Sequence, residues 1–243
     1  MGEIFSFLGT DSKCGTSQTV LSLATVLTGK YPEMKVLIFH AEEALGDDYI
    51  PVIQKSMEDI KPYLNDRLWD LESICSGALL KKNLSVIGGA DRTASGGLYS
   101  PEKVEAFLLD LASVFDLVLC DCGSDICHGL SLGALISAEK RCMVLSQGEK
   151  ALRRYEWLRP VLSKLDLDGE IFICCKYTDA NPCDRYYIDH RLMLQKGSVI
   201  PVSFAPDGGK AEFYRRPLIS FRNRKYTSDI ERLAELLFLK DGV

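Results

Sequence analysis

The segment Ser12–Thr19 holds the residues whose types and spacing fit the binding of a phosphate group. It reads Ser-Lys-Cys-Gly-Thr-Ser-Gln-Thr, follows the apolar run Ile4–Leu8 and precedes apolar residues at helical spacing. A strand, a short loop of small residues and a helix direct backbone N–H groups and a helix N-terminus at one anion. The usual pattern G-x-x-x-x-G-K-[ST] is half present, because Ser12 and Ser17 stand at the glycine positions and Gln18 stands at the lysine position. We therefore predict a nucleotide site that lacks its main cation.

Two carboxylates follow strand-like runs elsewhere in the chain. Glu42 comes shortly after Lys35–Phe39, and Asp121 comes directly after Leu117–Cys120. A carboxylate at the end of a strand can hold magnesium directly or through water, which is the role that we predict for Asp121. Taken alone, Glu42 could be a loop residue that only adds charge.

The elements that must position these residues alternate between strands and helices. Most of the strand-like runs are continuously apolar, which is typical of strands covered on both faces. Alternation of such strands with helices predicts an α/β fold with a mostly parallel, seven- or eight-stranded sheet and helices on both faces. The predicted strands are Ile4–Leu8, Lys35–Phe39, Leu84–Ile87, Leu117–Cys120, Cys142–Leu145, Ile171–Cys174 and Val199–Phe204.

The helix predictions depend on periodicity and on start signals. Ser100 before Pro101 is a clear start, since serine caps a helix and proline suits its first position. Glycine-rich loops at 88–90 and 95–97 are expected to flank a crevice at the carboxyl ends of the strands. The predicted helices are Thr19–Leu27, Pro101–Val114, Lys150–Leu165 and Thr227–Leu239, with short helices around Pro51–Tyr63 and Asp66–Leu80.

Size and composition favour one globular domain over residues 1–243. The chain is 47% hydrophobic and 26% charged, which suits a single ample core. Its apolar runs are far shorter than the roughly 20 residues that a bilayer crossing needs. The first residues enter a strand at once, so we expect no export signal and a cytoplasmic protein.

The nine cysteines do not indicate a disulfide framework. Several of them lie inside apolar runs, where a reduced thiol behaves as a small hydrophobe. Cys120, Cys122 and Cys127 with His128 could be considered as zinc ligands, but the paired C-x-x-C spacing of such sites is missing. We assign them no metal.

The phosphate-loop segment resembles the deviant Walker A motif of the MinD/ParA group of P-loop ATPases, written x-K-G-G-x-G-K-[ST]. Lys13 falls on the signature lysine of that group, Gly15 on its second glycine and Thr19 on its magnesium-binding hydroxyl. Phe115–Asp121 is similar to the Walker B strand, and Phe204–Asp207 is similar to the loop that covers the base. Keeping the first lysine without the second is similar to the TadZ/CpaE branch of pilus-assembly proteins. The resemblance implies a MinD/ParA-like P-loop NTPase fold over nearly the whole chain.

The resemblance also implies a set of functional residues, with ATP and Mg²⁺ as cofactors. Lys13, which would reach across a dimer, and Glu42 are the implied catalytic residues. Thr19 and Asp121 are the implied metal ligands. The implied nucleotide contacts are Lys13, Cys14, Gly15, Thr16, Ser17, Gln18, Thr19, Lys176, Tyr177 and Pro206.

Three departures from the group's pattern predict weak or absent hydrolysis. Gln18 replaces the phosphate-binding lysine, His40 replaces the first carboxylate of a D-x-D motif, and Cys175 replaces the asparagine that reads the base. A neutral amide loses the charge assistance that makes a phosphate contact strong. Phosphoryl transfer depends on such cations, so hydrolysis should suffer more than binding.

These observations leave three hypotheses for function. The first is a nucleotide-gated switch that forms a homodimer and acts, like TadZ/CpaE proteins, as a localisation or assembly factor with protein partners in a pilus or secretion machine. It would be recruited to a cell pole or to the inner face of the membrane. The second is a pseudo-ATPase scaffold that binds no nucleotide. The third is a ParA-like DNA-partition factor.

The net charge of the chain argues against the DNA-partition hypothesis, whereas one basic segment favours it. The net charge is −5, which does not favour nucleic acid as a partner, whereas the basic segment Lys210–Lys225 could be a DNA contact or a solvated surface. The last helix contains acidic residues and suits packing on the sheet, so we do not expect direct membrane binding.

Overall fold

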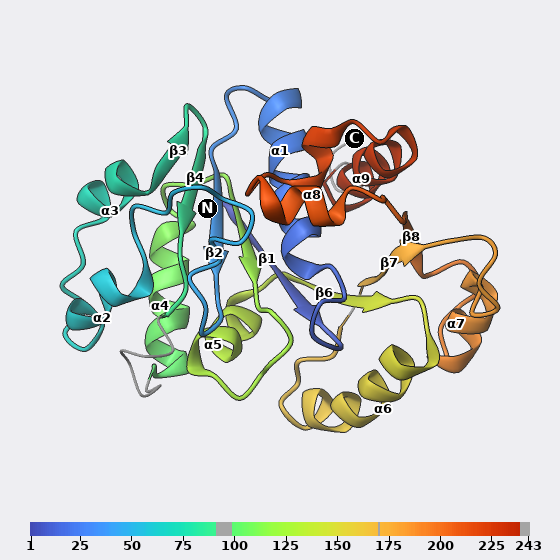
Figure 1. Cartoon of the computed structure of the whole chain (residues 1–243). Coiled ribbons are helices and arrows are strands. Elements are labelled where there is room, and N and C mark those ends of the chain that lie inside the picture. The colour runs from blue at the N-terminus through green and yellow to red at the C-terminus, as the bar shows by residue number, and fades with distance from the viewer. Residues whose placement is uncertain (91–98, 170, 239–243) are drawn as a thin grey trace.

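The computed structural model describes residues 1–90, 99–169 and 171–238, which build one sheet with helices on both of its faces (Figure 1). The eight strands follow the order β3-β4-β2-β5-β1-β6-β7-β8. All neighbouring strands are parallel except β3 and β4, which are antiparallel. The strands are β1 (Glu3–Gly9), β2 (Val36–His40), β3 (Leu79–Lys81), β4 (Leu84–Ile87), β5 (Leu117–Asp121), β6 (Lys140–Ser146), β7 (Ile171–Tyr177) and β8 (Ile200–Ser203). The predicted α/β class and mostly parallel sheet are confirmed.

The helices form a layer on each face of the sheet (Figure 1). One hydrophobic core contains residues of α1 and α9, and the other contains residues of α4, α5 and α6. The helices are α1 (Thr16–Lys30), α2 (Met57–Leu64), α3 (Leu71–Ala78), α4 (Pro101–Leu111), α5 (Gly129–Ser137), α6 (Glu149–Lys164), α7 (Arg185–Arg191), α8 (Gly208–Phe213) and α9 (Arg224–Phe238), with a 3₁₀ turn η1 (Leu218–Phe221) before α9.

The strands supply side chains to both cores in alternation. In β1, Phe5 and Phe7 pack under α1 and α9, whereas Ile4 and Leu8 pack on the opposite face. Successive side chains of a strand point to opposite faces, so a strand covered on both sides must be apolar throughout. This is why the strands read as continuous apolar runs.

The structure confirms the seven predicted strands and adds β3. That strand spans Leu79–Lys81 at the edge of the sheet and is largely exposed, so it carries no apolar pattern. The helix start at Pro101 was predicted correctly, whereas α1 and α9 begin three residues before their predicted starts, at Thr16 and Arg224. α5, α7 and α8 were missed; α5 has the sequence GLSLGALIS, which has no polar face to reveal a helical period.

Some expectations fall on residues outside the described parts of the chain. These are the glycine-rich loop at 95–97 and the predicted end of the last helix at Leu239. Within the described residues, α9 buries Tyr226, Ile230, Leu233 and Leu237 and packs against α1 and β8, as predicted. No helix in the described ranges has both the length and the apolar character that crossing a bilayer requires.

The sheet order creates a crevice next to β1. The chain runs from β1 to strands on one side of it and then returns to β6 on the other side. In open parallel sheets, ligands bind at the carboxyl ends of the strands where the strand order reverses in this way. The loop after β1, the loop after β2 and the end of β5 all lie at this edge.

Candidate functional site

The loop between β1 and α1 presents backbone amides of the first helical turn at the carboxyl edge of the sheet. The first hydrogen bond inside α1 runs from Thr19 N–H to Gly15 C=O at 2.9 Å. The preceding amides, from Gly15 to Gln18, therefore have no acceptor within the helix. The positive end of the helix dipole adds to their attraction for an anion. This geometry can bind a phosphate group.

Two glycines make the tight loop possible. Gly15 has φ 116°, and a Cβ atom there would lie 3.1 Å from Cβ of Cys175. At Gly9 a Cβ atom would lie 2.7 Å from Sγ of Cys14 and 2.7 Å from Oγ1 of Thr16. Neither position accepts a larger residue without movement of the loop, so both glycines fix the shape of the cradle.

Cys14 does not face the crevice. Its side chain is 1% exposed, and Sγ lies 3.2 Å from Oγ1 of Thr16 beneath the loop. Burial raises the pKa of the Cys14 thiol. The thiol supports the loop from beneath, and the nucleotide contact of Cys14 stays a prediction.

Thr19 and Gln18 use their side chains within the protein. The Thr19 hydroxyl donates to Gly15 C=O at 2.9 Å and lies 3.2 Å from Sγ of Cys175. Thr19 is 1% exposed and its hydroxyl is engaged in these two contacts, so its role as a magnesium ligand stays a prediction. Oε1 of Gln18 accepts a hydrogen bond from Leu218 N–H at 2.7 Å, which ties α1 to η1.

A cleft of about 950 Å³ opens over this loop. Predicted residues that line it are Lys13, Gly15, Thr16, Ser17, Gln18, Thr19, Glu42, Lys176 and Pro206. Most of the residues that were predicted for the nucleotide site therefore line one cleft. Its charge is unusual for an anion site, because the lining includes five carboxylates (Asp11, Glu42, Glu43, Asp48 and Glu212) but only two lysines, Lys13 and Lys176.

The two lysines lie close together at the mouth of the cleft. Both are exposed, and Nζ of Lys176 donates to the backbone carbonyl of Lys13 at 2.6 Å. Among the described residues, no ion pair involves Lys13. Asp11 in the same loop pairs with Lys150 of α6 at 2.5 Å.

The end of the cleft near β7 and β8 is more apolar. It is lined by Phe204, Ala205, Pro206, Leu218 and Tyr226. Phe204 is 52% exposed and lines the cleft with its aromatic ring. It ends a predicted strand and belongs to the segment Phe204–Asp207 that resembles the base-covering loop, but it was not among the predicted site residues.

Tyr177, a predicted nucleotide contact, and Cys175, which replaces the base-reading asparagine of the family pattern, both lie in β7. Tyr177 is outside the lining of the cleft, and its hydroxyl accepts a hydrogen bond from Arg185 N–H at 3.1 Å. Its nucleotide contact stays a prediction. Cys175 is buried behind Thr19, and burial raises its pKa to about 12, so its thiol stays neutral.

His40 and Asp121 lie behind the acidic end of the cleft, which Glu42 lines. β2 and β5 are neighbours in register, which places His40 beside Asp121. Nδ1 of His40 lies 3.4 Å from Oδ2 of Asp121, and Oδ1 of Asp121 accepts a hydrogen bond from Gly123 N–H at 3.2 Å. Glu42 lies next to Gly123, since a Cβ atom on that glycine would lie 2.4 Å from Oε2 of Glu42.

The basic segment Lys210–Lys225 is partly neutralised. Lys210 pairs with Asp207 at 2.8 Å, Arg215 with Asp47 at 2.5 Å and Lys225 with Asp179 at 3.0 Å. Half of its six cations thus have carboxylate partners. This reduces the positive potential that a DNA contact would need.

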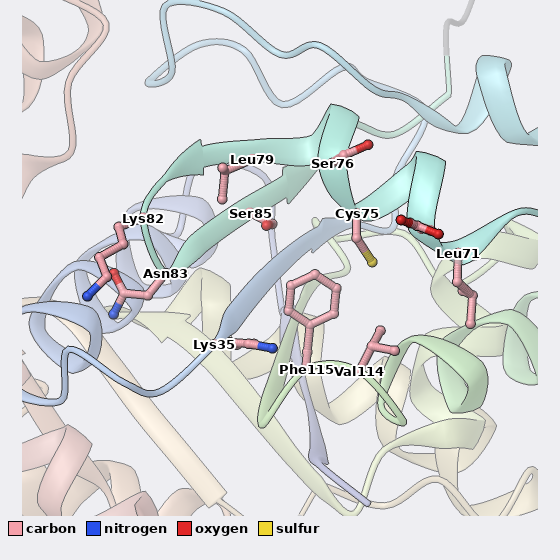
Figure 2. A pocket seen from close by; sticks show the side chains of 11 residues that line it. Lys35, Leu71, Cys75, Ser76, Leu79, Lys82, Asn83, Ser85, Val114 and Phe115 are labelled. Carbon is pink, nitrogen blue, oxygen red and sulfur yellow. The ribbon is translucent and has the colours of Figure 1, made fainter.

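A second cavity of about 550 Å³ lies at the opposite edge of the sheet. Figure 2 shows Cys75 and Phe115 beside this hollow, with Lys35 at one side. Lys35 and Phe115 come just before β2 and β5, so the cavity adjoins the amino ends of these strands. It contains none of the predicted site residues, and we therefore take the cleft over the β1–α1 loop as the candidate site.

Comparisons with known proteins identify the fold. No family model matches the chain, and no curated protein is significantly similar to it in sequence. Solved structures do match over their whole length. A ParA family ATPase from Chlorobium tepidum TLS has a TM-score of 0.81 at 16% identity, covering 96% of this chain and 99% of that one.

Two MinD structures are also similar. The septum site-determining protein MinD of Pyrococcus horikoshii OT3, in complex with Mg-ADP, has a TM-score of 0.76 at 18% identity and covers 100% of both chains. MinD of Aquifex aeolicus in a MinC:MinD complex has a TM-score of 0.74 at 15% identity, covering 100% of this chain and 98% of that one. The eight-stranded, mostly parallel α/β fold of this chain is the fold of the MinD/ParA P-loop ATPases.

Proposed function

We propose that the protein is a nucleotide-binding switch of the MinD/ParA type that binds ATP weakly and hydrolyses it slowly or not at all. The observation that carries this proposal is the row of backbone amides from Gly15 to Gln18, which have no helical acceptor and lie at the floor of the cleft. These amides favour a phosphate group without any side chain. The similar MinD structure that was solved with Mg-ADP supports the choice of a nucleotide.

We further propose a register for the phosphate loop that differs from the sequence prediction by two residues. The helix begins at Thr16, directly after Gly15, as a helix begins after the last glycine of a phosphate loop. Lys13 has φ 58°, a left-handed conformation that favours glycine. In this register Thr16 stands at the lysine position and Ser17 at the hydroxyl position.

The residues fit a nucleotide better than they fit its magnesium ion. The amides and the apolar end of the cleft suit a phosphate and a base, respectively. Ser17 lines the cleft and Asp121 ends β5, so Ser17, and not Thr19, would hold Mg²⁺ together with Asp121. When bound, the ion would neutralise phosphate charge.

The expected weakness follows from the missing cation. Thr16 can donate only a neutral hydrogen bond, whereas lysine donates a charge-assisted bond. The loss costs about 2–3 kcal/mol, or about 30- to 150-fold in affinity. Lys13 and Lys176 at the cleft mouth supply the remaining positive charge. Glu42 is the candidate for orienting a water.

In this register Asp11, and not Lys13, stands at the signature-lysine position, so our proposal of a homodimer rests on the exposure of Lys13 alone. An unpaired lysine at the mouth of a phosphate site can contact the nucleotide of a second copy. The biological role that we propose is that of a TadZ/CpaE-like localisation or assembly factor, which acts in the cytoplasm at a pole or membrane site and binds protein partners. The MinC:MinD complex provides a precedent for a protein partner on this fold.

Two alternatives have specific observations in their favour. A scaffold without nucleotide is favoured by the acidic lining of the cleft. A ParA-like DNA-partition factor is favoured by Arg216, Arg222 and Arg224, which are exposed on the basic segment.

Calorimetry of the purified protein with Mg-ATP tests the proposal. We expect binding at millimolar nucleotide, weaker binding for Gly15→Ala and loss of nucleotide-dependent dimers for Lys13→Ala. Absence of heat and no effect of either variant would leave the scaffold. A shift of duplex DNA that weakens with salt and disappears in Arg216→Ala/Arg222→Ala would instead favour the partition factor.

A further inference from the structure

His40 and Asp121 form a buried pair whose polar atoms are not satisfied. Both residues are 0% exposed. Nδ1 and Nε2 of His40 and Oδ2 of Asp121 have no hydrogen-bond partner, although Nδ1 and Oδ2 lie 3.4 Å apart. A buried polar atom without a partner costs about 1–3 kcal/mol, so such atoms are rare and require a reason.

The backbone holds the two side chains at this separation. His40 and Asp121 are paired in the register of β2 and β5, and Ala41 N–H donates to Asp121 C=O at 2.7 Å. The His40 ring is covered by Gly46, which has φ 76° and where a Cβ atom would lie 2.3 Å from Cγ of the ring. The sheet fixes one side of the pair, and the loop after β2 fixes the other.

Glu42 provides a third group at the same point. One ligand atom each of His40, Glu42 and Asp121 can be chosen so that all three lie within 4.8 Å of one another. Glu42 also lines the cleft, whereas His40 and Asp121 lie behind it. An ion that enters through the cleft would therefore meet Glu42 and then the buried pair.

The spacing of the pair fits a tetrahedral ion. Zinc binds imidazole nitrogen and carboxylate oxygen at about 2.0–2.1 Å, which places neighbouring tetrahedral ligands about 3.4 Å apart. Magnesium at about 2.0–2.1 Å in octahedral geometry would place neighbouring ligands about 2.9 Å apart. The observed 3.4 Å agrees with the first value.

We propose that His40, Glu42 and Asp121 form a binding site for a divalent transition-metal ion of the Zn²⁺ class, which is occupied without nucleotide. Imidazole nitrogen is a good ligand for zinc and its neighbours and a poor one for magnesium. The excess of carboxylates over lysines in the cleft attracts a dication even when no phosphate is bound. The site does not depend on the proposed nucleotide function, because its ligands belong to the protein.

Metal analysis of the full chain without nucleotide tests this inference. The protein is stripped with chelator, incubated with Zn²⁺, Mn²⁺ or Mg²⁺, desalted and analysed by mass spectrometry. We expect about one Zn²⁺ per chain and no retained Mg²⁺. Loss of a partner that only supports a ligand costs about 10- to 100-fold in affinity, so His40→Asn and Glu42→Gln should each weaken Zn²⁺ at least that much.

The chain offers matched controls in its two other histidines. His128 lies 3.1 Å from Oε1 of Glu43 and 3.3 Å from Oδ2 of Asp125 on the surface, and His190 lies near the end of α7. His128→Asn and His190→Asn should leave Zn²⁺ binding unchanged. Loss of binding in either control, unchanged binding in His40→Asn or the absence of bound Zn²⁺ in the parent would overturn the proposal.

A spectroscopic measurement avoids dependence on variants that fail to fold. X-ray absorption of the Zn²⁺-loaded parent protein should show nitrogen and oxygen ligands without sulfur. A sulfur ligand would assign the ion to a cysteine and refute the proposed site. ATP calorimetry on the metal-free protein separately tests the nucleotide proposal, so the two can fail independently.

Discussion

A lysine that replaces Thr16 in the phosphate loop should tighten ATP binding, whereas a lysine that replaces Gln18 should not. The two positions distinguish the register that we propose from the register expected from sequence. Thr16 is the first residue of α1 and lies against the loop, whereas the side chain of Gln18 is bonded to Leu218 in η1. Only a lysine at the first position of the helix would extend along the cradle toward the phosphates.

The magnitude can be worked out from the contacts at each position. A lysine at Thr16 gains a charge-assisted phosphate contact of about 2–3 kcal/mol. It also displaces the Thr16 hydroxyl from Sγ of Cys14, at 3.2 Å, and we take about 1 kcal/mol for this loss. The net gain of about 1–2 kcal/mol corresponds to about 5- to 30-fold tighter ATP.

At Gln18 the same substitution has a cost without the gain. Lysine cannot accept the hydrogen bond from Leu218 N–H, now 2.7 Å long, and the half-buried amide loses its acceptor. We expect about 1–3 kcal/mol lower stability and unchanged ATP affinity for Gln18→Lys.

Calorimetric titration with Mg-ATP measures both variants against a matched control. Thr28→Lys adds the same charge to α1 at its far end and should leave affinity unchanged. Tighter ATP for Gln18→Lys than for Thr16→Lys would refute the proposed register. If neither variant gains affinity, the loop does not bind phosphate.

Three further predictions concern the loop, a cysteine and the core. Gly15→Ala should weaken ATP and lower the melting temperature, because φ 116° strains any residue with a Cβ atom; an unchanged melting curve would contradict this. Cys127 is exposed and should be the thiol that reacts fastest with iodoacetamide. Its hydrogen bond with Asp125 raises its pKa, so Asp125→Asn should speed labelling at pH 7.5, as measured by intact mass. Asp189→Ala should lower the free energy of unfolding by about 2–4 kcal/mol in denaturant titration, because this buried carboxylate accepts bonds from the amides of Gly197 and Val199 at 2.6 and 2.9 Å; a loss below about 1 kcal/mol would contradict that role.

The strands could be predicted from sequence because burial on both faces leaves a direct signal. β1, β5 and β7 are apolar runs of strand length, and their ends lie within a few residues of the predicted ends. β3 and α5 could not be predicted in the same way. The first is too short and exposed to show alternation, and the second is apolar on all sides.

The candidate site could be located from sequence, but not the direction of its side chains. The order of loop, Glu42 and Asp121 along the chain placed these residues at one edge of the sheet. Whether the Thr19 hydroxyl faces the cleft depends on where α1 begins, and helix ends are poorly determined by sequence pattern. Because α1 begins a few residues earlier than predicted, Thr19 lies within the helix and its hydroxyl lies next to Sγ of Cys175.

Two features of the site, the absence of a lysine in the phosphate loop and the presence of His40, change the charge of the cleft in opposite directions. Loss of the lysine leaves the phosphate region with less positive charge. A carboxylate at position 40 would stand beside Asp121 in a fully buried site, where like charges repel strongly. An imidazole there removes one negative charge from the cleft and, with Asp121 and Glu42, adds a ligand set that can hold a dication. A dication bound by these three residues would thus supply positive charge that the phosphate loop lacks.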